Sequence, residues 1–347
     1  MVVAFYISGH GFGHASRELE LITAIAAARP DARFVVRTSV PAWLLETSPV
    51  PLDVRPCETD TGVAQIDSLA LDEEETARRA AAFYGDFDRR VEEDATFLRD
   101  VQADLVISDI PPLACAAAAR AGVPAVALGN FTWDWIYAAY PAFIQLAPHA
   151  IPCMQAAYSA TTLALRLPLH GGFEPMARVT ANIPFIARRS TRDPEDTRRL
   201  LGVPAGKPVV LASFGGYGVS LPVDELSQSA HFTLIVANRH PPSGLLYEDL
   251  VAAADVVVSK PGYGIVSECV ANGAALLYTS RGHFVEYDVF VAQMPSVVRC
   301  RYISQEDLLA GRWTDAIDAL LAQPAAPMRA WTNGAQVAAE RIRRLMA

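Results

Sequence analysis

The sequence predicts an α/β protein made of two doubly wound domains that face each other across a cleft. Short apolar runs alternate with helical stretches along the chain, and glycine-rich loops follow such runs in both halves. The chain has 347 residues, which suits two domains of about 150 residues each. Strands that alternate with helices form parallel sheets, and such sheets bind ligands at the carboxyl ends of their strands.

In the first half, nearly continuous apolar runs predict strands covered on both faces. These strands are expected at Val2–Ser8, Arg33–Ser39, Leu52–Cys57, Asp104–Asp109 and Val123–Gly129. Helices are expected between them at Ala15–Ala28, Glu73–Arg99 and Leu113–Ala121.

The stretch Ala187–Lys207 is rich in Arg, Asp and Thr and predicts an interdomain linker with a short helix. A second series of elements follows it, with strands at Pro208–Phe214, Phe232–Ala237, Asp255–Ser259 and Ala274–Thr279 and helices at Ile265–Asn272, Leu308–Leu321 and Gln336–Met346. We therefore expect one domain over residues 1–190 and a second over 205–330. Residues 331–347 would form a C-terminal helix that packs back on the first domain.

Amino-acid composition and net charge limit the classes of protein to which this chain could belong. Hydrophobic residues make up 52% of the chain and charged residues 19%, which predicts a large core. The net charge of −9 disfavours a nucleic-acid partner. No apolar run approaches the ~20 residues of a transmembrane helix, so a cytoplasmic protein is expected, with peripheral membrane contact still open. The five scattered cysteines lack metal-ligand spacing, and no metal or cofactor is expected.

The first motif is the loop Gly9–His14, between a predicted strand and a predicted helix. Gly11 and Gly13 would let a ligand approach the backbone, and the helix N-terminus would favour an anion or an oxygen-rich ligand. His10 and His14 are both candidates for a general base that takes a hydroxyl proton. The spacing is not that of a dinucleotide fingerprint, and a tight turn without a ligand is the alternative.

The second motif covers residues 259–268 and again leads from a strand into a helix. Its glycines and helix N-terminus suit a diphosphate, to which Lys260 would add a positive charge. Glu268, about one turn into the helix, could accept hydrogen bonds from the two hydroxyls of a ribose; a solvated helix residue is the alternative. Gly215 and Gly216, after the first strand of the second half, form a weaker candidate loop.

Two further positions lie at predicted strand ends. Asp109 could orient a histidine or bind an acceptor hydroxyl. The segment Asn130–Trp135 is rich in aromatic residues and could stack on a sugar or line a cleft, while a place in the core is equally compatible with Trp133 and Trp135. The sequence has no P-loop and no nucleophile elbow, so neither an ATPase nor an α/β-hydrolase is indicated.

These motifs resemble a known superfamily. Residues 258–264 with Glu268 resemble the donor motif of bacterial peptidoglycan N-acetylglucosaminyltransferases and plant galactolipid synthases, which are GT-B glycosyltransferases. The loop Gly9–Ala15, the turn Ser108–Pro112 and the segment Asn130–Asp134 resemble the N-terminal, non-kinase region of plant L-arabinokinases. The kinase motif of those proteins is absent here, so arabinose phosphorylation is not implied.

The resemblance implies two Rossmann-like domains, with the acceptor on the first and a nucleotide sugar, UDP-linked, on the second. Carried over by position, His14 or His10 would be the base, and Gly11, Gly13, Asn130, Trp133 and Asp134 would lie on the acceptor side. The donor side would comprise Gly215, Gly216, Lys260, Gly262, Tyr263, Gly264, Ser267, Glu268 and Glu286, the last near the donor sugar. Transfer would be inverting and independent of metal.

Two other functions remain open from the sequence. The chain could be a nucleotide-sugar-binding module without catalytic activity. It could also be an epimerase or hydrolase of nucleotide sugars on the same fold.

Overall fold

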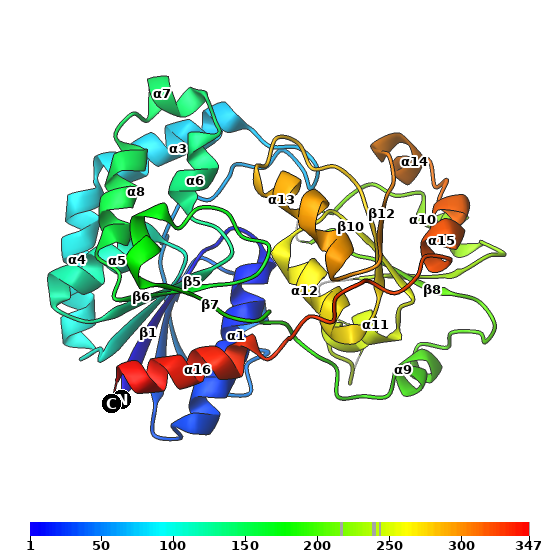
Figure 1. Ribbon diagram of the computed structural model, residues 1–347, viewed down its shortest axis with the longest axis horizontal. Helices are drawn as coiled ribbons and strands as arrows, with labels where there is room; N and C mark the ends of the chain where they lie inside the picture. The colour runs from blue at the N-terminus through cyan, green and yellow to red at the C-terminus, as the bar shows by residue number, and fades with distance from the viewer. Residues whose placement is uncertain (216–217, 238–240, 243, 347) are drawn as a thin grey trace. The chain divides into compact units, whose positions relative to one another are not determined.

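The computed structural model describes residues 1–215, 218–237, 241–242 and 244–346, and they form two compact units. Unit 1 comprises Met1–Gln65, Leu71–Ile186 and Asn333–Ala347, and unit 2 comprises Ile66–Ala70 and Ala187–Thr332. Gly216, one of the predicted donor residues, lies outside the described residues. Each unit is an α/β layer structure with its own sheet (Figure 1).

Among its described residues, unit 1 holds a seven-stranded sheet in the order β3-β2-β1-β4-β5-β6-β7, and neighbouring strands pair in parallel. The strands are β1 (Val2–Ile7), β2 (Arg33–Thr38), β3 (Leu52–Pro56), β4 (Leu105–Asp109), β5 (Ala125–Gly129), β6 (Leu163–Arg166) and β7 (Thr180–Asn182). The central strands β4 and β5 are buried throughout. Their continuous apolar runs are explained by helices on both faces.

The helices of unit 1 connect these strands. They are α1 (Phe12–Ala28), α2 (Ala42–Leu45), α3 (Glu73–Gly85), α4 (Phe87–Asp100), α5 (Pro112–Ala121), α6 (Trp133–Ala138), α7 (Ala142–Leu146), α8 (Ala150–Ser159), the 3₁₀ helix η1 (Glu174–Val179) and α16 (Gly334–Leu345). The charged stretch predicted as one helix forms two, because the chain breaks at Asp86 between α3 and α4. Strands β6 and β7 were not predicted.

The described part of unit 2 holds a five-stranded sheet in the order β12-β11-β10-β8-β9, also with parallel pairing. Its strands are β8 (Val209–Ala212), β9 (Thr233–Val236), β10 (Val256–Ser259), β11 (Ala275–Tyr278) and β12 (Cys300–Tyr302). Its helices are α9 (Pro194–Leu200), α10 (Val223–Ser227), α11 (Tyr247–Ala253), α12 (Tyr263–Asn272), α13 (Glu286–Gln293), η2 (Met294–Ser296), α14 (Gln305–Leu309) and α15 (Thr314–Leu321).

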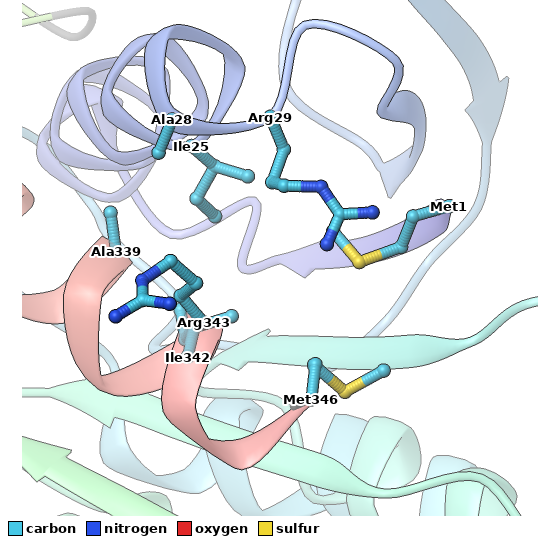
Figure 2. Close-up of a pocket in the computed structure, with 8 residues that line it drawn as sticks. All are labelled: Met1, Ile25, Ala28, Arg29, Ala339, Ile342, Arg343 and Met346. Carbon is cyan, nitrogen blue, oxygen red and sulfur yellow. The ribbon is translucent and has the colours of Figure 1, made fainter.

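The last helix, α16, belongs to unit 1 and packs against α1, close to the N-terminus (Figure 1). Figure 2 shows a small, mostly apolar pocket between these two helices, and Ile25 and Ile342 contribute to its lining. None of its lining residues is a predicted site residue. Within the described ranges, no helix has the length and apolar character needed to span a bilayer.

Candidate functional site

The strand order of unit 1 brings the first glycine-rich loop next to Asp109. Strand β1 pairs with β2 on one side and with β4 on the other, and Ile7 lies opposite Asp109 in the β1–β4 register. The connections leaving β1 and β4 therefore diverge, and such a switch point is where open α/β sheets bind ligands. Two segments a hundred residues apart in the chain thus supply one candidate site.

The centre of this site is a buried pair formed by His14 and Asp109. The His14 Nδ1 atom lies 2.8 Å from Asp109 Oδ1, and the two side chains are 7% and 0% exposed. The helix α1 begins at Phe12 after Gly11, whose φ of 84° favours glycine. This start places His14 in the first turn of α1, facing the end of β4.

Arg17, one turn further along α1, is a member of this cluster that the sequence did not single out. Its Nε donates to Asp109 Oδ2 at 2.5 Å, its Nη2 donates to Asp109 Oδ1, and its Nη1 donates to Asn130 Oδ1 at 2.9 Å. The Nη2 atom also lies 3.0 Å from His14 Nδ1. Burial opposes ionisation of Asp109, but the charge of Arg17, followed by the hydrogen bonds from Arg17 and His14, outweighs it and lowers the pKa of this carboxyl.

Glu18 is fully buried beside this pair. Burial, followed by the negative charge of Asp109, raises the pKa of Glu18 well above its usual value. Neither carboxyl oxygen of Glu18 has a hydrogen-bond partner at normal distance among the described residues. The cost of burying an unpaired carboxylate agrees with this direction.

His10, the other candidate base, is held by a second loop that the sequence analysis missed. Its Nδ1 accepts a hydrogen bond from the backbone N–H of Val63 at 3.2 Å. In the same loop, Asp60 accepts from Ser8 Oγ at 3.1 Å and from Trp133 Nε1 at 2.9 Å. Burial raises the pKa of Asp60 to about 6 despite these bonds. Because His10 Nδ1 is an acceptor, this ring carries its proton on Nε2, which makes it a donor and a poor base.

The acceptor-side residues lie deeper than the sequence suggested. Trp133 and Asn130 are 0% exposed and Asp134 is 3% exposed. Trp133 packs its ring on Tyr137 and edge-on against His10 and Phe131, so stacking on a sugar is excluded for it in this conformation. These three residues are packed in the interior, because they follow the end of β5, which is an inner strand of the sheet. Gly11 and Gly13 are less buried and border the cluster.

In unit 2, the switch point lies between β8 and β10. The two predicted donor loops leave these two strands, and they are tied together where Ser259 Oγ donates to the carbonyl of Ser213 at 2.5 Å. Gly215 has a φ of 71°. Gly262 precedes α12, and Tyr263 and Gly264 open it, while Ser267 is buried and donates to the carbonyl of Gly264 at 2.9 Å. The backbone N–H groups at this helix start suit an anion.

Basic side chains accompany this helix start. Burial, followed by the charge of Arg281, lowers the pKa of Lys260 to about 7, while Asp67 opposes the shift. Arg281 Nη1 lies 3.8 Å from Glu286 Oε2 and donates to the carbonyl of Pro261 at 3.4 Å. Glu286 thus pairs with Arg281 at the start of α13.

Glu268 is buried and ion-paired. Arg188 binds its Oε1 through Nε at 2.7 Å and through Nη2 at 2.6 Å. The guanidinium of Arg188 also lies over the ring of Tyr247, with 4.8 Å between Cζ and the ring centre. The alternative of a solvated Glu268 is therefore wrong. Arg188 was predicted only as part of a linker, and no local pattern marks it as the partner of a residue 80 positions away.

Comparison with known proteins was made on sequence and on structure. No protein-family model matches the sequence. The chain is 30% identical over 337 residues to an L-arabinokinase of Arabidopsis thaliana, a match that spans 92% of this chain. It spans only 32% of that relative, so the chain corresponds to about a third of its length.

Solved structures of low sequence identity share the architecture over nearly the whole chain. CalG4, the calicheamicin glycosyltransferase, has a TM-score of 0.64 at 15% identity and covers 99% of this chain and 97% of its own. Phytolacca americana UGT2, solved with UDP-2fluoro-glucose and pterostilbene, has a TM-score of 0.59 at 12% identity, covering 99% and 94%. The chain has the GT-B fold. The two parallel sheets of this GT-B chain agree with the fold class that the sequence predicted.

The GT-B fold is not confined to transferases among the matches. A protein described as a UDP-N-acetylglucosamine 2-epimerase from Listeria monocytogenes has a TM-score of 0.57 at 12% identity and covers 99% of this chain and 94% of its own. At such identities the likeness establishes the GT-B fold alone.

Proposed function

We propose that the chain transfers a sugar from a UDP-linked donor to a hydroxyl acceptor, with inversion and without a metal ion. The observation that carries this proposal is the contact of 2.8 Å between His14 Nδ1 and Asp109 Oδ1 at the switch point of unit 1. A carboxylate on Nδ1 orients the imidazole and leaves Nε2 to act as a base. His14 is therefore preferred over His10.

In this reaction His14 Nε2 takes the proton of the acceptor hydroxyl. The acceptor oxygen attacks the anomeric carbon as the bond from that carbon to the diphosphate oxygen breaks, so the configuration inverts and UDP leaves. Lys260 and the N-terminus of α12 would stabilise the charge of the departing diphosphate. Glu286 and Gly215 are proposed to contact the sugar or a phosphate. The acceptor and the sugar are left unassigned.

Glu268 is proposed to bind the ribose of the donor. Its Oε1 is taken by Arg188, which fixes the carboxylate in one orientation. The second oxygen would accept from a ribose hydroxyl, as a charge-assisted hydrogen bond. The binding of UDP-2fluoro-glucose by a protein of the same fold supports a UDP donor.

The first experiment is a thermal-shift screen over nucleoside diphosphates and their sugars, followed by transfer assays with the donors that bind. A ligand at 100 times its Kd should add about 2.7 kcal/mol of stability. His14→Ala should lower turnover by about 10²–10⁴ with binding of UDP retained. His149→Ala is the matched control, because this exposed histidine makes no side-chain cap bond at α8. Unchanged turnover in folded His14→Ala would show that another group is the base.

A nucleotide-sugar-binding module is the second candidate. The specific observation in its favour is that the chain matches about a third of an L-arabinokinase, a protein whose name describes a different reaction. Binding of UDP that depends on Glu268, with no turnover of any donor, would support the module. Release of UDP without an acceptor would instead indicate an epimerase or hydrolase, and the Listeria neighbour is described as an epimerase.

A further inference from the structure

The side chain of Arg17 is buried and contacts both His14 and Asp109. It is 3% exposed, and its flat guanidinium meets Asp109 side-on, with Nε at one carboxylate oxygen and Nη2 at the other. This bidentate geometry is specific to arginine. A histidine and a carboxylate can pair without an arginine. The presence of Arg17 beside His14 and Asp109 therefore requires an explanation.

The groups that face His14 come from three segments. Helix α1 supplies Arg17 and Glu18, and the end of β4 supplies Asp109. The loop after β3 supplies Asp60, which interacts electrostatically with His14. The charges of Arg17 and Asp109 balance, and Asp60 and Glu18 are the other carboxyl groups near the ring.

We propose that Arg17 is the positioning residue of this site: it cancels the charge of Asp109 and locks its orientation, so that His14 stays a neutral imidazole with its proton on Nδ1. This inference rests on the proposed function, since it assigns Arg17 the task of keeping the base available.

The fork geometry fixes the orientation of Asp109, and Arg17 Nη2 also lies 3.0 Å from His14 Nδ1. Arg17 directs the parallel hydrogens of Nε and Nη2 at the two oxygens of Asp109. The contact between Asp109 Oδ1 and His14 Nδ1 then needs a hydrogen from the ring, because an ionised carboxylate only accepts. Nε2 is left as the proton acceptor. Without Arg17, the bare charge of Asp109 would favour an imidazolium, which cannot act as a base.

The test compares Arg17→Met, Arg17→Lys and Arg37→Met in the full chain. Arg37 is the matched control, because it also pairs with a buried aspartate, Asp94, at 2.7 Å, and has no contact with the proposed site. Two readouts are used: the acid limb of the pH–rate profile, and the ¹⁵N chemical shifts of the His14 ring, assigned with His14→Gln.

The wild-type ring should show a protonated Nδ1 and an unprotonated Nε2 at pH 7.5. In Arg17→Met the ring should be an imidazolium at that pH, and the acid limb should move upward by about one pH unit or more. Arg17→Lys keeps the charge but loses the fork, so it should retain the wild-type pH profile with a lower kcat. Arg37→Met should change stability without moving either readout.

Should Arg17→Met fail to fold, the double variant Arg17→Met/Asp109→Asn replaces the ion pair by neutral groups and should keep the ring neutral at pH 7.5. A wild-type ring protonated on Nε2, or an Arg17→Met ring that is still neutral at pH 7.5, would overturn the proposal. The ring spectra do not depend on turnover. A chain without transferase activity would therefore refute the proposed function while leaving the role of Arg17 to be read from the spectra.

Discussion

Lys260 illustrates how one side chain links ligand binding to pH. It is half-buried just before α12, and burial with the neighbouring Arg281 lowers its pKa to about 7. A bound diphosphate would bring negative charge to this position and favour the charged form. Binding of UDP should therefore be accompanied by uptake of a proton when the free protein is near or above pH 7.

We predict that the affinity for UDP falls as the pH rises above about 7. The charged form is lost in the free protein there, and binding must first restore the proton. Calorimetric titration in buffers of different ionisation enthalpy would measure the proton taken up. Lys260→Met should abolish the proton uptake and weaken binding. An affinity that is constant from pH 6 to pH 9 would show that Lys260 does not face the diphosphate.

At the scale of elements, the return of α16 to unit 1 depends on one glycine. Gly334 opens the helix, and its N–H donates to the carbonyl of Phe185 at 2.9 Å. A Cβ on this residue would lie 2.2 Å from the carbonyl oxygen of Pro184 and 2.7 Å from that of Phe185. Both oxygens belong to the backbone, so the neighbours cannot rotate away.

We predict that Gly334→Ala destabilises unit 1 by about 1–3 kcal/mol, the usual cost of overpacking. Urea denaturation followed by circular dichroism would measure the loss. Gly85→Ala is the control, because an added Cβ there meets no atom within 4 Å near the end of α3. The control should be neutral or slightly stabilising, since alanine favours a helix. Equal stability of the two variants would contradict the packing of α16 described above.

At the scale of the whole molecule, each unit carries its candidate groups at the switch point of its own sheet. In unit 1 the loops follow β1 and β4, and in unit 2 they follow β8 and β10. The two units differ in chemistry. Unit 1 offers a histidine with a buried carboxylate, and unit 2 offers a helix start with basic side chains.

We predict that UDP protects unit 2 and not unit 1 from hydrogen exchange. The amides of residues 259–272, which cover the loop after β10 and helix α12, should exchange more slowly with UDP bound, while those of 105–129 in unit 1 should be unaffected. Mass spectrometry of peptides would read this out. Glu268→Gln should reduce the protection at equal UDP concentration. Protection confined to residues 105–129 would refute the assignment of the nucleotide to unit 2.

The strands and helices that position the site were largely predictable. The apolar runs gave β1, β4, β8 and β10, and the loops that leave them were identified from glycines next to a helix start. Strands β6, β7 and β12 were missed; β7 and β12 have only 3 residues each and are partly exposed, so their apolar pattern is weak. The helix break at Asp86 was missed because charged residues continue on both sides of it.

The sequence by itself determined the two parallel sheets, the positions of the glycine-rich loops and the choice of His14, Asp109 and Glu268 as candidates. These features depend on local pattern, which a single chain displays directly. Only the tertiary structure decided their partners. Arg17 reaches Asp109 across 92 residues of sequence, and Arg188 reaches Glu268 across 80, because strand order brings these segments together. The burial of Trp133 was decided in the same way, since the central position of β5 is a property of the folded sheet.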